Sequence, residues 1–237
     1  MFTFTETASH NDFIQRIDRG VLTQHPEVHV CQVAFNLAAF NEEAFHRYGV
    51  ISPPQLATAV AKRKAEYLAG RYCCAQLLAA KGAPTQVASG ADRAPCWPAG
   101  FNGAISHCRG QAIALLARCE QGWPGIDIEN FNADTLRESA DLITTPAERA
   151  RLRGGPLEYE LALLLAFSAK ESLYKALYPQ VQRFFDFHSA SILSIDPQRG
   201  HFLIALTQDL TPQLRQGFSV TGSYRFEGNT MTTLLLA

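Results

Sequence analysis

The sequence predicts an α/β protein, in the broad sense that includes α+β folds, and three observations lead to this prediction. The chain has 237 residues, enough for one large domain or two small ones. Of these residues 47% are apolar, so a substantial core can form. Long segments rich in Ala and Leu occupy the middle of the chain, and strand-like patterns prevail near its end. Helical segments followed by a series of strands are typical of mixed architectures.

The first half of the chain is predicted to contain one long helix among several strands. Residues 1–26 show little periodicity and are predicted as loop or short helix. The long helix is predicted at residues 55–81, where Gly82 and Pro84 end it. Strands are predicted at 28–35, 103–107 and 111–118, a short helix at 41–48, and a loop at 92–100.

The second half is predicted to be organised around a central helix at residues 157–177, which Pro179 ends. A strand at 125–129 and short helices at 131–141 and 145–153 precede this helix. Four strands are predicted after it, at 184–195, 202–207, 218–226 and 231–236.

The central helix carries charged residues although apolar side chains surround nearly all of it. Lys170, Glu171 and Lys175 lie on this helix. Unpaired charges in an apolar setting are costly, so these side chains need partners or ligands. One interpretation is a local ion pair between Glu171 and Lys175, worth roughly 0.2–0.5 kcal/mol. That interpretation leaves Lys170 unexplained.

Acidic and apolar residues alternate in the strand at 125–129, which reads Gly-Ile-Asp-Ile-Glu. Asp127 and Glu129 therefore share one face of the strand, about 7 Å apart, and repel each other unless a cation lies between them. Together with Glu171 they offer three oxygen ligands of the kind that suits Mg²⁺ bound with phosphates. Lys170 and Lys175 beside that metal would neutralise phosphate oxygens.

These two motifs together resemble the signature of 4′-phosphopantetheinyl transferases: Gly-Ile-Asp-Ile-Glu, followed from residue 167 by Phe-Ser-Ala-Lys-Glu-Ser-Leu-Tyr-Lys. The resemblance covers about residues 62–178 and points to the branch that activates siderophore and secondary-metabolite synthases. It implies two pseudo-symmetric α/β halves, residues 1–122 and 123–237, with the active site in the cleft between them. Because one such chain plays the part of a dimer, a monomer is expected.

The resemblance also implies a coenzyme A site in the first half. Arg63 and Arg71 match an Arg–Glu–Gly-Arg pattern whose arginines bind coenzyme A phosphates in that branch, and arginine suits phosphate because its planar guanidinium binds two oxygens at once. Arg93 would contact a phosphate, and Ser106 and His107 the 3′-phosphate and nearby groups. The alternatives are a solvated helix face for the arginines and a core histidine for His107. The chain has Ala104 where the family often has Ser.

The activity that follows is that of a holo-[acyl-carrier-protein] synthase. It would transfer 4′-phosphopantetheine from coenzyme A to a serine of apo acyl, aryl or peptidyl carrier proteins, which belong to fatty-acid, polyketide or nonribosomal-peptide synthases, and would release adenosine 3′,5′-bisphosphate. Mg²⁺ held by Asp127, Glu129 and Glu171 would stabilise the leaving group, and Lys170 and Lys175 would neutralise the remaining charge. Glu171 is the expected general base, with Glu129 as the alternative.

The composition limits the other classes of protein to which the chain could belong. The net charge of −1 gives no field that favours nucleic acid, and neither a membrane span nor a signal peptide is recognisable, so a cytoplasmic protein is expected. The six cysteines lack metal-ligand spacing and are expected to be small buried residues rather than disulfides. Two competing functions stay open: a metal-dependent pyrophosphate hydrolase acting on coenzyme A or nucleotides, and a non-catalytic module that binds coenzyme A or carrier proteins.

Overall fold

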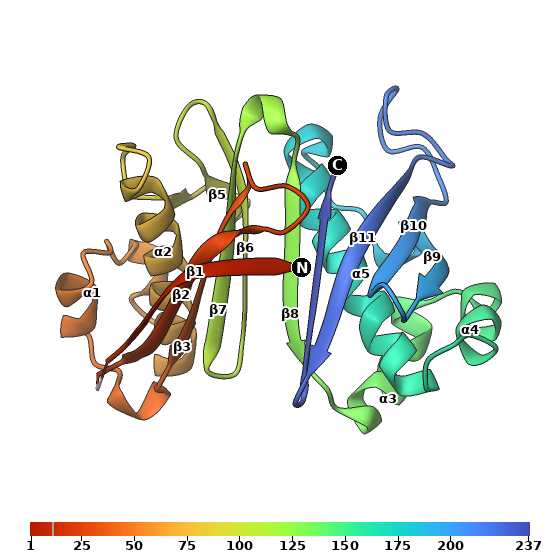
Figure 1. The fold of residues 1–237 in the computed structure, drawn as a ribbon, viewed down its shortest axis with the longest axis horizontal. Coiled ribbons are helices and arrows are strands. Elements are labelled where there is room, and N and C mark those ends of the chain that lie inside the picture. The colour runs from red at the N-terminus through yellow and green to blue at the C-terminus, as the bar shows by residue number, and fades with distance from the viewer. Residues whose placement is uncertain (11) are drawn as a thin grey trace. The chain divides into compact units, whose positions relative to one another are not determined.

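A computed structural model describes residues 1–10 and 12–237, and the chain divides into two compact units, Met1–Trp123 and Pro124–Ala237 (Figure 1). Each unit combines a five-stranded antiparallel sheet with a long helix packed on it. This mixture of helices and sheets confirms the predicted α/β class. Among the described residues, no helix is long and apolar enough to cross a membrane.

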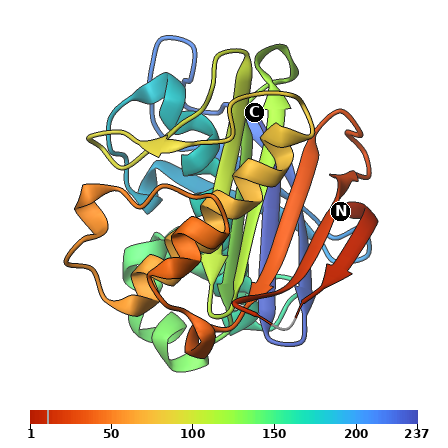
Figure 2. The ribbon, with the colours of Figure 1, turned by 90° about the vertical axis from the view of Figure 1, so that its left-hand side faces the viewer.

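The first unit is built on a sheet whose strand order is β1-β2-β3-β7-β6. Its strands are β1 (Phe2–Ser9), β2 (Ile14–Leu22), β3 (His29–Phe35), β6 (Phe101–Cys108) and β7 (Gln111–Arg118). Helix α2 (Ala61–Ala79) packs against β3, β6 and β7, and Figure 2 shows it lying across one face of this sheet. Smaller elements are α1 (Glu43–Arg47), the 3₁₀ turns Leu37–Ala39, Pro54–Leu56 and Cys119–Gln121, and a ribbon of β4 (Ala88–Ser89) and β5 (Pro95–Cys96).

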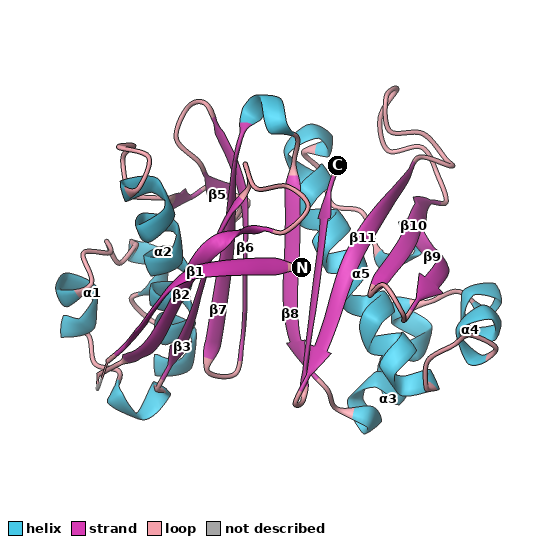
Figure 3. Cartoon of the chain, in the orientation of Figure 1, coloured by secondary structure: helices cyan, strands magenta, loops and turns pink. Residues whose placement is uncertain are grey.

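The second unit has the strand order β8-β12-β11-β10-β9 (Figure 3). Its strands are β8 (Pro124–Asn130), β9 (Ala190–Asp196), β10 (His201–Leu206), β11 (Ser219–Glu227) and β12 (Thr230–Leu236). Helices α3 (Ala133–Ile143), α4 (Pro146–Arg153) and α5 (Tyr159–Val181) and the 3₁₀ turn Phe187–Ser189 complete it. Helix α5 packs against β8 and β12 and buries most of its surface, which explains its apolar sequence.

The two units share one order of elements. In the first, β3 leads to α2, and the chain returns through β6 to β7, which pairs with β3. In the second, β8 leads to α5, and the chain returns to β12, which pairs with β8. In the sequence of each unit, the long helix therefore comes after the first of these two paired strands and before the second.

The prediction of loop or short helix for residues 1–26 is wrong, because β1 and β2 lie there. The sequence pattern that would indicate these two strands is weak for two reasons. Strand β1 pairs with β2 alone and exposes most of its side chains, and an irregularity between Ile14 and Arg16 breaks the alternation of β2. Asn11, which also falls in this stretch, lies outside the described residues.

Three predicted boundaries also move. Helix α5 continues through Pro179, because a proline in the last turn removes one hydrogen bond without breaking the helix. The helix is capped by Gln182, which lies in the left-handed region with φ 50°. Helix α2 begins at Ala61 rather than at residue 55, since the 3₁₀ turn Pro54–Leu56 precedes it. Strand β9 begins at Ala190 instead of residue 184.

Candidate active site

Helix α5 lies directly on strand β8 because Gly125 leaves room for it. A Cβ at Gly125 would come within 2.0 Å of the backbone oxygen of Ser172. Side chains alternate along a strand, so Asp127 and Glu129 lie on the same face as Gly125, which is the face that α5 covers. Ile126 and Ile128, both 0% exposed, lie on the other face.

An aspartate of β8 and two charged residues of α5 form a cluster on this face, which we call the carboxylate–lysine cluster: Asp127, Glu171 and Lys175. Lys175 Nζ donates to Asp127 Oδ1 at 2.6 Å, and only 2% of Asp127 is exposed. Burial raises the pKa of Glu171 above its usual value, the nearby Asp127 raises it further, and Lys175 opposes the shift. Two carboxylates and one lysine thus lie together between the helix and the sheet.

The donor types of this cluster fit a hard divalent cation such as Mg²⁺. Its oxygens belong to carboxylates, and a cation between Asp127 and Glu171 would offset both the burial and the nearby negative charge that raise the pKa of Glu171. Within residues 1–10 and 12–237, however, no group of three His, Cys, Asp or Glu side chains is close enough to hold a metal ion. The roles of Asp127, Glu129 and Glu171 as metal ligands therefore stay a prediction.

Lys170, for which a phosphate contact is predicted, does not belong to this cluster. Its Nζ donates to Glu148 Oε2 at 2.6 Å and to the backbone oxygen of Ile143 at 2.8 Å. The side chains of Lys170 and Glu148 are 2% and 0% exposed. Lys170 is one residue from Glu171, but a step of about 100° around the helix turns it toward α4 instead of β8. The predicted phosphate contact would therefore require Lys170 to leave a buried ion pair.

In the first unit, α2 and β6 bring Arg63 and His107 together. Helix α2 approaches β6 closely at Gly70, where a Cβ would lie 3.0 Å from the side chain of Ile105. His107 shares a face of β6 with Ile105, and its Nε2 lies 3.0 Å from Arg63 Nη1. The guanidinium can only donate, so Nε2 accepts and the ring proton sits on Nδ1, which faces Glu66 Oε2 at 3.8 Å.

The other predicted residues of the first unit lie in different surroundings. Arg71 is 9% exposed, donates to Ser89 Oγ at 2.9 Å and stacks on the Tyr67 ring at 4.8 Å, so it ties α2 to the β4–β5 ribbon. Arg93 is exposed at the turn of that ribbon, in the left-handed region with φ 69°. Ser106 is buried and, as the neighbour of His107 in a strand, points to the opposite face of β6.

Sequence reasoning missed the role of Glu148. The Thr145-Pro-Ala-Glu148 pattern indicates a helix cap, and the Thr145 side chain does accept from the Glu148 backbone N–H. The carboxylate of Glu148, however, turns inward. The sequence offers one indication of this role: Lys170 lies on an apolar helix and therefore needs a buried acidic partner elsewhere in the chain.

Comparison with known proteins gives matches over both units. Residues 52–117 match the family model described as the 4′-phosphopantetheinyl transferase N-terminal domain, and residues 124–225 match that of the 4′-phosphopantetheinyl transferase superfamily. The chain is 34% identical over 221 residues to enterobactin synthase component D of Salmonella typhi, covering 92% of each protein. It is 48% identical over 123 residues to the protein of the same name from Escherichia coli, covering 52% of this chain and 58% of that protein.

Another relative is the 4′-phosphopantetheinyl transferase PptT of Mycobacterium tuberculosis, 36% identical over 145 residues, which are 59% of this chain and 62% of PptT. The two-unit α/β fold and these matches define a transferase: the chain belongs to the 4′-phosphopantetheinyl transferase superfamily. Within it, the chain falls in the branch of the enterobactin synthase components D.

Proposed function

We propose that the chain transfers 4′-phosphopantetheine from coenzyme A to a serine of apo carrier proteins and releases adenosine 3′,5′-bisphosphate. The carboxylate–lysine cluster between α5 and β8 carries this proposal, because it pairs carboxylates with a cation in a largely buried site. The names of the relatives support carrier proteins of siderophore synthesis as substrates. We also propose carrier proteins of fatty-acid, polyketide and other nonribosomal-peptide synthases as substrates. The protein is proposed to be a monomer located in the cytoplasm.

The chemistry requires a serine hydroxyl to reach a negatively charged pyrophosphate. The serine oxygen forms a bond to the phosphorus that carries pantetheine, and the bond from that phosphorus to the bridging oxygen breaks. Glu171 accepts the serine proton, and its raised pKa makes it a stronger base than an ordinary carboxylate. Glu129 is the alternative base. Lys175 turns from Asp127 toward the departing phosphate oxygen and neutralises it.

Asp127, Glu129 and Glu171 would hold Mg²⁺, which supplies positive charge at the pyrophosphate when it is bound. At the nucleotide end, Arg63 and His107 would bind the 3′-phosphate, since Arg63 already lies against the imidazole. Arg93 is exposed and free to reach a phosphate from the turn of the β4–β5 ribbon, which Arg71 anchors on α2.

Mass spectrometry of apo carrier proteins incubated with the protein, coenzyme A and Mg²⁺ tests this function. The expected result is a gain of one phosphopantetheine group on the carrier serine, with release of adenosine 3′,5′-bisphosphate. A parallel reaction without carrier protein separates the alternatives. A pyrophosphate hydrolase would release nucleotide in both reactions, whereas a binding module would release none in either. Either of those results would overturn the proposal.

A further inference from the structure

The ion pair between Lys170 and Glu148 joins four elements of the second unit. Lys170 lies on α5, Glu148 on α4, and the backbone oxygen of Ile143 that also accepts from Lys170 Nζ ends α3. The second oxygen of Glu148, Oε1, accepts from the backbone N–H of Ile192 in β9 at 2.7 Å. The carboxylate of Glu148 is thus bonded through both oxygens inside the protein.

Helix α5 is held by polar contacts on two nearly opposite sides. On the sheet side, Ser168 Oγ and Ser172 Oγ each lie 2.8 Å from Thr233 Oγ1 of β12. On the other side, Lys170 is held by Glu148. Lys170 and Ser172 are about 200° apart around the helix, and Glu171 lies between them, about 100° from each. The direction in which Glu171 points is therefore set by both anchors.

We propose that Glu148 is a positioning residue for the transfer reaction: by holding Lys170, it fixes the rotation of α5 so that Glu171 and Lys175 face Asp127. This inference rests on the proposed function. Side-chain atoms lie roughly 5 Å from a helix axis, so a rotation of about 20° displaces Glu171 by roughly 2 Å. A misplacement of about 1 Å can lower a rate about 100-fold.

The other anchor of α4 provides a matched control. Arg151 Nε donates to the backbone oxygen of Ile192 at 3.1 Å, and Arg151 Nη2 donates to Ser191 Oγ at 2.7 Å. Arg151 and Glu148 thus bind the same residue of β9 from the same helix, but Glu148 also holds α5. A variant of Arg151 loosens α4 against β9 and leaves the link to Lys170 in place.

The test compares Glu148→Gln with Arg151→Gln in the full chain. Both variants should unfold at a lower temperature than the wild type. Glu148→Gln should lower kcat about 10- to 100-fold. It should also weaken Mg²⁺ binding, measured by calorimetry with coenzyme A present. The KM for coenzyme A should stay within about twofold of the wild-type value, because Arg63 and His107 are unchanged. Arg151→Gln should leave kcat and Mg²⁺ binding at wild-type values.

Two results would overturn the positioning role. One is a folded Glu148→Gln protein with wild-type kcat and Mg²⁺ affinity, and the other is an equal loss of kcat in Arg151→Gln. If Glu148→Gln does not fold, Glu148→Asp takes its place, since it keeps the charge and shortens the reach by one methylene; the same losses are expected. Wild-type protein without transfer activity would instead contradict the proposed function, whereas the calorimetric comparison still decides the positioning role.

Discussion

Lys175 Nζ donates to Asp127 Oδ1 at 2.6 Å, and this contact joins the last third of α5 to the acidic strand β8. The two residues are 48 positions apart in the chain. The lysine side chain is 23% exposed and the aspartate side chain 2%, so the lysine is the partner that can turn toward a ligand. The ion pair stabilises the buried carboxylate, and in the proposed reaction a substrate phosphate takes the place of Asp127 as the partner of Lys175.

Glu171→Gln should abolish transfer while the protein stays folded. Burial disfavours the charged form of Glu171 and raises its pKa, so a neutral amide of the same shape should leave the melting temperature unchanged or slightly higher. Loss of the base should lower kcat by at least about 100-fold. The measurement is turnover of carrier protein beside thermal unfolding.

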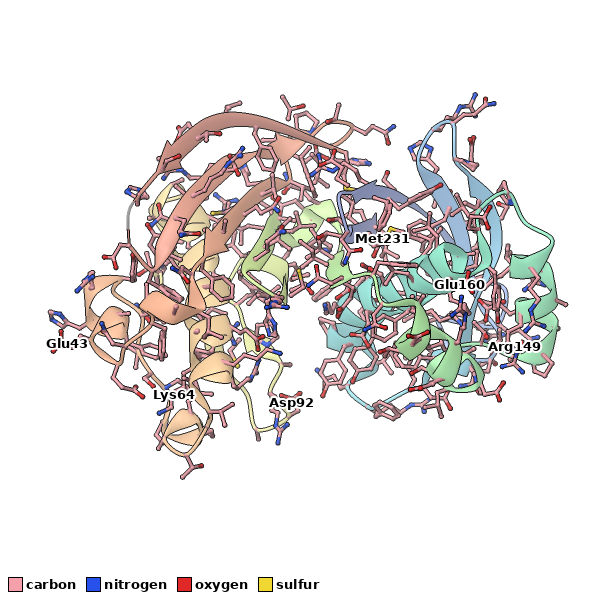
Figure 4. The ribbon with its side chains drawn as sticks, turned by 90° about the horizontal axis from the view of Figure 1, so that it is seen from below. Glu43, Lys64, Asp92, Arg149, Glu160 and Met231 are labelled. Atoms are coloured by element: carbon pink, nitrogen blue, oxygen red, sulfur yellow. The ribbon has the colours of Figure 1, made fainter. Side chains whose placement is uncertain are left out.

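Glu160→Gln is the control for that experiment, because Glu160 (labelled in Figure 4) lies in the first turn of the same helix. Its carboxylate pairs with Arg137 at 2.7 Å. It should keep wild-type turnover. Wild-type turnover of Glu171→Gln would remove Glu171 from the mechanism.

Arg63→Ala should raise the KM for coenzyme A more than it changes kcat. A hydrogen bond to a charged group contributes about 1.5–3 kcal/mol, which corresponds to a rise of roughly 10- to 100-fold. Lys62→Ala is the matched control, because Lys62 is the neighbouring residue on α2, has a side chain that is 65% exposed and lies 3.7 Å from Glu66. An unchanged KM in Arg63→Ala would refute the phosphate role assigned to α2.

Gly125→Ala should destabilise the second unit and reduce activity. The added methyl group would meet the backbone oxygen of Ser172, which cannot move without shifting α5 away from β8. Overpacking of this kind costs about 1–3 kcal/mol, and the shift also separates Lys175 from Asp127. Chemical denaturation measures the loss. Gly217→Ala is the comparison, because a Cβ there meets no atom within 4 Å and any loss reflects its φ of 88° alone. Equal stability of Gly125→Ala and wild type would contradict the close approach.

The sequence predicts those parts of the fold and site that depend on local patterns. The alternation in residues 125–129 predicts the strand β8 and the shared face of Asp127 and Glu129, because both follow from a period of two. The Ala- and Leu-rich segments predict α2 and α5 for the same kind of reason.

Contacts between residues that are far apart in the chain cannot be predicted from such local patterns. Glu148 lies 22 residues before Lys170 on another helix, and neither position carries a pattern that announces the pair. Arg71 matches a family pattern, yet its contact with Ser89 depends on where the β4–β5 ribbon folds back. Helix angles alone group Lys170 with Glu171, whereas the packing of α4 decides which way each side chain points.

His29 should make the stability of the first unit depend on pH. It lies on β3, and Lys81 Nζ donates to its Nε2 at 2.5 Å, so the imidazole is neutral. Burial lowers the pKa of His29, and the positive charge of Lys81 lowers it further. As the pH falls, the unfolded chain therefore binds the proton before the folded protein does. The stabilising contribution is complete above the unfolded value of about 6.5 and is lost as the pH falls toward the folded pKa.

Thermal unfolding of wild type and His29→Gln between about pH 7.5 and pH 5.5 measures this effect. The wild type should lose more stability over that range than the variant does, because the glutamine cannot take up a proton. Lys81→Met is the informative control: burial is the larger cause of the lowered pKa, so most of the pH dependence should survive the loss of the lysine. Identical pH profiles for wild type and His29→Gln would show that His29 keeps an ordinary pKa in the folded protein.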